Sequence, residues 1–102
     1  MEIKKNEKDG RFYIVRAARA GVFFGKIKEK SAGSVIMTDV RKLWYWDGAA
    51  AVEQIAVDGV RAPENCKFTV SVSAMEIMDP IQIIPCTKKA AGIIKAVREW
   101  RM

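Results

Sequence analysis

Hydrophobic and polar positions alternate through much of the chain, and this alternation predicts strands. The clearest case is residues 22–30, where Phe23 and Ile27 share one face and Phe24, Lys26, Lys28 and Lys30 share the other. Gly25 interrupts this strand and indicates a bulge or a bend. A glycine turn over 31–34 predicts a hairpin to 35–40, which is apolar on both faces and therefore central. Further strands are predicted over 11–16, 42–46, 67–73, 75–78 and 81–84.

Two short segments have helical spacing instead. Residues 49–57 are rich in alanine, with Asp47 as the expected cap and Gly59 as the expected stop. Residues 88–97 carry an apolar stripe after Thr87, which is a good N-cap residue. The last residues, 98–102, are expected to be extended, with Trp100 packed back onto the body.

This order of elements predicts a small α+β domain: a mostly antiparallel twisted sheet or partial barrel with two short helices. A flexible charged leader is expected over 1–10 and a single globular domain over 11–102. No apolar run is long enough to cross a membrane and the leader lacks the apolar centre of a signal peptide, so we expect a cytoplasmic protein. Cys66 and Cys86 are expected to be free, buried thiols.

The net charge of +6 is unevenly distributed, basic toward both ends and acidic over residues 43–85. Lys26, Lys28 and Lys30 would form one positive stripe on an unbroken strand, and nucleic-acid phosphates could follow it. Lysines also protect edge strands against aggregation, and this second interpretation is favoured.

The aromatic segment 44–46 lies directly after two cations. Trp44 and Trp46 would share one face of a strand beside Arg41 and Lys42, with Tyr45 facing water on the other. Such a face can stack on a nucleotide ring, but two tryptophans more often fill the core of so small a domain, and we favour the core. Apolar residues on both faces also favour a homo-oligomer.

Residue types that support catalysis are scarce in this chain. Histidine is absent, which removes the commonest general base and metal ligand. Two cysteines cannot supply the four ligands of a structural zinc site, and the carboxylates are dispersed. We therefore expect no enzymatic activity, no cofactor and no metal.

Five blocks of the sequence resemble a family of small uncharacterised proteins found mostly in bacteriophages and prophages. The most specific block is Trp-Tyr-Trp-Asp-Gly-Ala-Ala within 41–50, and the other four cover 21–25, 54–60, 63–68 and 84–87. The resemblance implies a phage origin and a compact domain, and it implies no activity. Relatives often carry serine where this chain has Ala51, so a hydroxyl contact or helix cap is lost there.

Three functions remain open. The first is a non-enzymatic phage accessory protein that inhibits a host protein or sequesters an anionic nucleotide signal, in the manner of an anti-defence protein. Its candidate ligand residues are Arg16, Arg19, Arg41, Lys42, Trp44, Tyr45 and Trp46. The second is a nucleic-acid-binding module that uses Lys26, Lys28, Lys30 and the basic C-terminus. The third is a minor phage structural or assembly protein.

Overall fold

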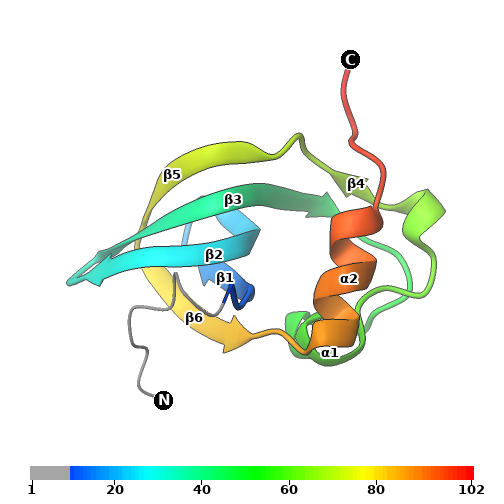
Figure 1. Cartoon of the computed structure of the whole chain (residues 1–102), viewed down its shortest axis with the longest axis horizontal. Helices are drawn as coiled ribbons and strands as arrows, with labels where there is room; N and C mark the ends of the chain where they lie inside the picture. Colours follow the sequence, from blue (N-terminus) through cyan, green and yellow to red (C-terminus); the bar gives the residue numbers. More distant parts are fainter. Residues whose placement is uncertain (1–9) are drawn as a thin grey trace.

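The computed structural model describes residues 10–102, so the leader expected over 1–10 lies outside the described residues except for Gly10. Six strands, two α-helices and one 3₁₀ turn follow one another along the described chain (Figure 1). They are β1 (Tyr13–Ala17), β2 (Gly21–Ser31), β3 (Ser34–Tyr45), α1 (Val52–Asp58), η1 (Pro63–Asn65), β4 (Lys67–Phe68), β5 (Val72–Met78), β6 (Pro80–Pro85) and α2 (Lys88–Ala96).

β3 is the central strand of an antiparallel sheet. Its neighbours are β2 on one side and both β5 and β4 on the other, and the path continues from β2 through β1 to β6. The expectation of a central strand over 35–40 is therefore confirmed. The separate strand expected over 42–46 is the second half of the same strand.

The two edge strands, β5 and β6, are joined through one residue. Asp79 lies between them with a φ of 56°, a left-handed conformation that turns the chain sharply. Because β5 pairs with β3 and β6 pairs with β1, this corner brings the two ends of the sheet together and curls it without closing it (Figure 1). The fold is the predicted α+β domain on a twisted antiparallel sheet.

Bulges in β2 change which lysines share a face. The ladder with β3 shifts register on both sides of Lys26 and Ile27, so that Lys26 lies opposite Thr38 and Lys30 lies opposite Val35. Thr38 and Val35 are three residues apart on a regular strand and therefore face opposite sides. The single lysine stripe predicted from the alternation is wrong, because that pattern assumes an unbroken ladder.

Gly25 is the residue that permits the first bulge. A Cβ atom at this position would lie 2.9 Å from both the Thr38 carbonyl oxygen and Val40 Cα, so only glycine fits against β3 here. The bulge predicted at Gly25 is confirmed.

The hydrophobic core lies on both faces of the sheet. One cluster packs the helices against the sheet and includes Ile14, Phe24, Ile55, Phe68 and Ile94. The second cluster fills the inside of the curled sheet and includes Val15, Phe23, Ile27, Met37 and Ile77. Adjacent residues on β1 and β2 thus enter different clusters, which is why both faces of these strands are apolar in the sequence.

The two helices begin differently. Thr87 caps α2 as predicted: its hydroxyl oxygen accepts a hydrogen bond from the Ala90 N–H at 3.0 Å and donates one to the Val57 carbonyl at 2.7 Å. Ala51 is the N-cap residue of α1 and offers no side-chain bond. The cap expected from Asp47 is wrong, because its carboxylate accepts a bond from Asn65 instead.

Cys66 and Cys86 are free and buried, as predicted. Burial raises the pKa of the Cys86 thiol to about 12, because the apolar surroundings disfavour the thiolate. Within residues 10–102, no helix combines the length and apolar character needed to span a membrane.

Candidate ligand-binding surface

An exposed aromatic pair lies where the end of β3 meets β4 and the C-terminal tail. The rings of Trp44 and Trp100 stack with centroids 4.9 Å apart, and Lys67 of β4 places its ammonium 5.4 Å and 5.5 Å from the two centroids. Trp44 is 54% exposed and Trp100 is 37% exposed. We call Trp44, Lys67 and Trp100 the aromatic surface.

The expectation that Trp44 belongs to the core is wrong. β3 pairs with β4 through Leu43 opposite Phe68 and Tyr45 opposite Lys67, with a register shift between these two pairs. Trp44 is the extra residue at this shift and extends into solvent. Trp46 is half-buried against the helix-side core, and Tyr45 is 49% exposed, as expected for its hydroxyl.

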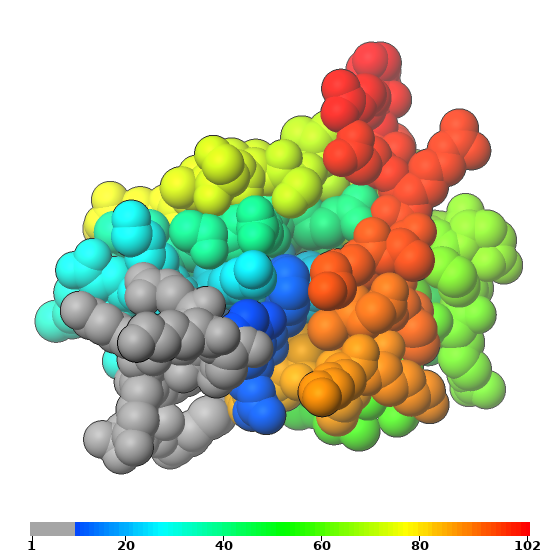
Figure 2. All heavy atoms as spheres, in the orientation of Figure 1, coloured from blue at the N-terminus to red at the C-terminus, as the bar shows by residue number. Residues whose placement is uncertain are grey.

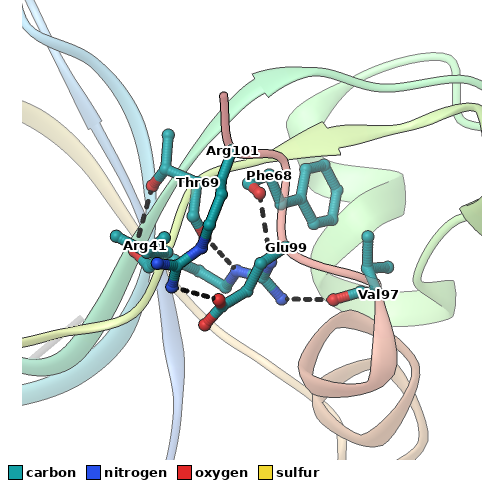
Figure 3. A network of polar contacts seen from close by, with 7 residues as sticks. Arg41, Phe68, Thr69, Val97, Glu99 and Arg101 are labelled. Carbon is teal, nitrogen blue, oxygen red and sulfur yellow. Dashed lines mark hydrogen bonds and ion pairs between the residues drawn. The ribbon is translucent and has the colours of Figure 1, made fainter.

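Arg41 is a buried anchor, although the sequence suggested it as a ligand residue. Its side chain is only 5% exposed and donates four hydrogen bonds to main-chain carbonyls. Figure 3 shows the surroundings of this side chain, with Phe68, Thr69 and Val97 labelled. Nε binds the Thr69 oxygen at 2.9 Å, Nη1 binds the oxygens of Ile94 and Val97 at 3.1 and 2.9 Å, and Nη2 binds that of Phe68 at 3.1 Å. Four of the five guanidinium N–H groups are thus engaged by the protein itself.

These bonds fix the place of the aromatic surface. Ile94 and Val97 lie at the C-terminal end of α2, where the helix carbonyls carry partial negative charge that favours a cation. Phe68 accepts a second bond from the Trp100 N–H at 2.8 Å, and it forms a parallel bridge with Glu99. Arg41 therefore holds β4 and the tail together. Burial lowers the pKa of its guanidinium, and the nearby Glu99 carboxylate opposes that shift.

A groove of about 690 Å³ lies beside the aromatic surface, between the segment 63–67 and the tail 96–101. Its cationic lining comes from Lys67, Arg98 and Arg101, and its acidic lining from Glu64 and Glu99. Arg101 already holds Glu99 at 2.7 Å, and this hydrogen bond lowers the pKa of the Glu99 carboxyl. The tail, drawn in red, projects from the body (Figure 2).

The other predicted cations do not gather at this surface. Lys42 lies opposite Phe23 and Arg16 opposite Val22, so they face opposite sides of the sheet. The Lys42 side chain lies against Gly21, where a Cβ atom would be 2.8 Å from its Cε. Arg19 is exposed in the turn between β1 and β2.

The lysines of the predicted stripe are also separated. Lys26 pairs with Asp39 at 3.3 Å, and its ammonium lies 5.6 Å from the centre of the Phe12 ring. Lys28 and Lys30 are exposed toward the tip of the β2–β3 hairpin, away from the aromatic surface (Figure 1).

Two members of the aromatic surface were not among the predicted ligand residues. Lys67 was placed correctly on the wet face of its strand, but its position opposite Tyr45 depends on the pairing of β3 with β4. Trp100 was expected to pack on the body, and no pattern in the sequence identifies Trp44 as its partner.

Comparison with known proteins gives one result. The model of a family described as "Domain of unknown function (DUF6948)" matches residues 10–94, which is most of the chain. No curated protein and no solved structure matches the chain. Among the described residues, no cluster of three or more cysteine, aspartate or glutamate side chains could hold a metal ion.

Proposed function

From the geometry of the aromatic surface we propose a binding function for this chain, which belongs to the DUF6948 family of domains of unknown function. It is a phage-encoded, non-enzymatic accessory protein that acts in the cytoplasm of the host. Its ligand is a nucleotide-type signal, whose base stacks on the aromatic surface and whose phosphate groups contact the neighbouring cations.

The exposed stack of Trp44 and Trp100 carries this proposal. Large aromatic rings left in water are unfavourable, and an exposed apolar patch with polar surroundings marks an interaction site. The Lys67 ammonium is nearly equidistant from the two ring centroids, so it lies beside the stack and not over an outer ring face. Stacking of one base on an aromatic side chain contributes about 1–3 kcal/mol.

Charge near the stack complements a phosphate group. Lys67, Arg98 and Arg101 line the adjoining groove, and Arg101 keeps the Glu99 carboxylate engaged. A ligand that is both aromatic and anionic can thus contact the rings and the cations together. The nucleic-acid alternative has less support, because Lys26 and Lys30 lie on opposite faces of β2, so the three lysines do not form one stripe.

The test is isothermal titration calorimetry with ATP, set against tripolyphosphate as an anion without a ring. We expect saturable binding of ATP, and binding at least tenfold weaker for tripolyphosphate, for Trp44→Ala and for Lys67→Gln. Lys30→Gln is the matched control, because it removes the same charge from the distant hairpin and is expected to bind ATP normally. Equal binding of ATP and tripolyphosphate, or no binding of ATP, would refute a stacking site.

Native mass spectrometry of protein purified from cells complements the titration. A bound mass in the range of a nucleotide, lost on denaturation, is the expected result. The same spectrum reports the oligomeric state, for which a homo-oligomer remains our prediction.

A further inference from the structure

Within the described chain the sheet has three strands at its edges, β4, β5 and β6, and two of them are protected against further pairing. β4 is two residues long, and its Phe68 forms a bridge to Glu99 of the tail. β6 begins with Pro80 and ends with Pro85, and a proline has no N–H to offer to an added strand. Short length, proline and covering by another segment are common ways in which proteins prevent pairing at a sheet edge.

β5 has none of these features. It is seven residues long, contains no proline and no basic residue, and pairs with β3 without a register shift. Among the described strands its only partner is β3, and β5 and β6 diverge from the corner at Asp79 (Figure 1). In the space-filling view, β5 forms part of the upper rim of the molecule (Figure 2). The edge of β5 that faces away from β3 is therefore open to another strand.

The pairing with β3 decides which main-chain groups lie at this open edge. The Asp79 N–H donates to the Gly33 carbonyl at 2.9 Å, one residue beyond the end of β5. In an antiparallel ladder, the residues that bond to the same neighbouring strand recur at every second position. The N–H and C=O groups of Ala74, Glu76 and Met78 therefore point away from β3, where an added strand can pair with them.

The side chains of β5 suit a second copy of the same strand. Val72 is 36% exposed and Met78 is 57% exposed, whereas Met75 between them is half-buried. When two copies pair antiparallel around Met75, Val72 of each copy lies opposite Met78 of the other, and these exposed apolar side chains cover one another. Glu76 then lies opposite Ala74. A pairing centred on Glu76 would place two carboxylates opposite each other, and one centred on Ala74 would place Val72 opposite Glu76.

We propose that two copies of this chain associate through their β5 edges, antiparallel and with the two Met75 residues at the twofold axis. The two sheets become continuous, and main-chain hydrogen bonds at Ala74 and Glu76 join them. Two seven-residue edge strands bury less than the roughly 1,200–2,000 Å² of a standard stable interface, so the dimer is weak, with a dissociation constant in the micromolar range. This interface gives the predicted homo-oligomer a defined surface and does not depend on the nucleotide proposal.

Analytical ultracentrifugation over a wide range of protein concentrations tests the association. We expect a reversible equilibrium between monomer and dimer for the unchanged chain. Ala74→Pro should weaken dimerisation at least tenfold with an unchanged circular dichroism spectrum, because it removes an N–H that β3 does not use. Trp44→Ala should dimerise normally and Ala74→Pro should bind ATP normally, so failure here is distinguishable from failure of the nucleotide proposal. A monomer at every concentration, or a dimer that Ala74→Pro leaves unchanged, would overturn the proposal.

Cysteine cross-linking tests the register and does not depend on the folding of a proline variant. Opposite residues of a non-hydrogen-bonded pair lie about 4.5 Å apart at Cα, within the range that a disulfide spans. Met75→Cys should therefore form a disulfide-linked dimer under mild oxidation, whereas the buried Cys66 and Cys86 should form none. Ser73→Cys is the matched control, because it is more exposed than Met75 but its two copies lie four positions apart, about 13 Å along the strands. Equal cross-linking of the two variants, or none for Met75→Cys, would refute the proposed pairing.

Discussion

Replacing Arg41 with methionine tests whether one buried cation holds the aromatic surface in place. Methionine keeps much of the aliphatic stem and removes the guanidinium with its four hydrogen bonds. After this substitution the carbonyl oxygens of Phe68 and Ile94 still accept one hydrogen bond each, from the backbone N–H groups of Trp100 and Val97 respectively. The carbonyl oxygens of Thr69 and Val97 accept from Arg41 alone among the described contacts.

The magnitude follows from those two carbonyls. A buried polar group without a partner costs about 1–3 kcal/mol, so two cost about 2–6 kcal/mol. Removing a buried charge recovers part of its desolvation penalty, which is the cause of the lowered pKa of Arg41. We expect a net loss of about 2–4 kcal/mol, a large share of the roughly 5–15 kcal/mol that stabilises a typical domain.

The assay is urea unfolding followed in parallel by circular dichroism and tryptophan fluorescence. Arg19→Met serves as the control, because it removes an exposed arginine from the β1–β2 turn and should change stability by less than about 0.5 kcal/mol. The loss of stability for Arg41→Lys should lie between those for Arg19→Met and Arg41→Met, because a single ammonium cannot reach carbonyls on several sides. A loss below about 1 kcal/mol for Arg41→Met would refute the role of Arg41 as the anchor.

Three further predictions concern single side chains. Trp44→Ala should lower the free energy of unfolding in urea by only about 1 kcal/mol because Trp44 is exposed, whereas Phe68→Ala should lower it by about 3–5 kcal/mol. An equal loss in the two variants would mean that Trp44 belongs to the core. Ala51→Ser should stabilise the protein by about 0.5–2 kcal/mol by capping α1, and an unchanged urea midpoint would count against this. Stability should fall between about pH 8.5 and pH 12, because the unfolded chain loses the Cys86 proton that the folded chain keeps up to a pKa of about 12; Cys86→Ala should flatten this slope, and an identical slope would exclude the thiol as its source.

The strands and helices were predictable because each depends on residues close together in the chain. Alternation located β2, and Thr87 marked the start of α2. The single strand predicted over 67–73 is wrong, because the structure has the two-residue β4 at 67–68 and begins β5 only at Val72. The face of the sheet on which each side chain lies was less predictable. Gly25 signalled a bulge, but the sequence does not say how many residues on β3 lie opposite it, and that number decides where Lys26 and Lys30 point.

Of the three residues of the aromatic surface, only Trp44 was predicted from the sequence as a ligand residue. Trp44 stood out because of its neighbours in sequence, yet its exposure depends on a register shift with a two-residue strand. The carbonyl partners of Arg41 lie 27 to 56 residues away along the chain, beyond the reach of any local pattern. An arginine beside tryptophans therefore suggested a ligand contact when its place is in the interior.

The aromatic surface joins two parts of the chain that differ in their relation to the family. Trp44, Lys67 and Arg41 lie within the matched region 10–94, and Trp100 lies beyond it. Arg41 bridges the two parts, because it binds the carbonyls of Phe68 and Thr69 inside the region and that of Val97 outside it. The buried guanidinium therefore helps to fix the tail that places Trp100 against Trp44. The desolvation cost of that charge is offset by hydrogen bonds that also position the aromatic surface.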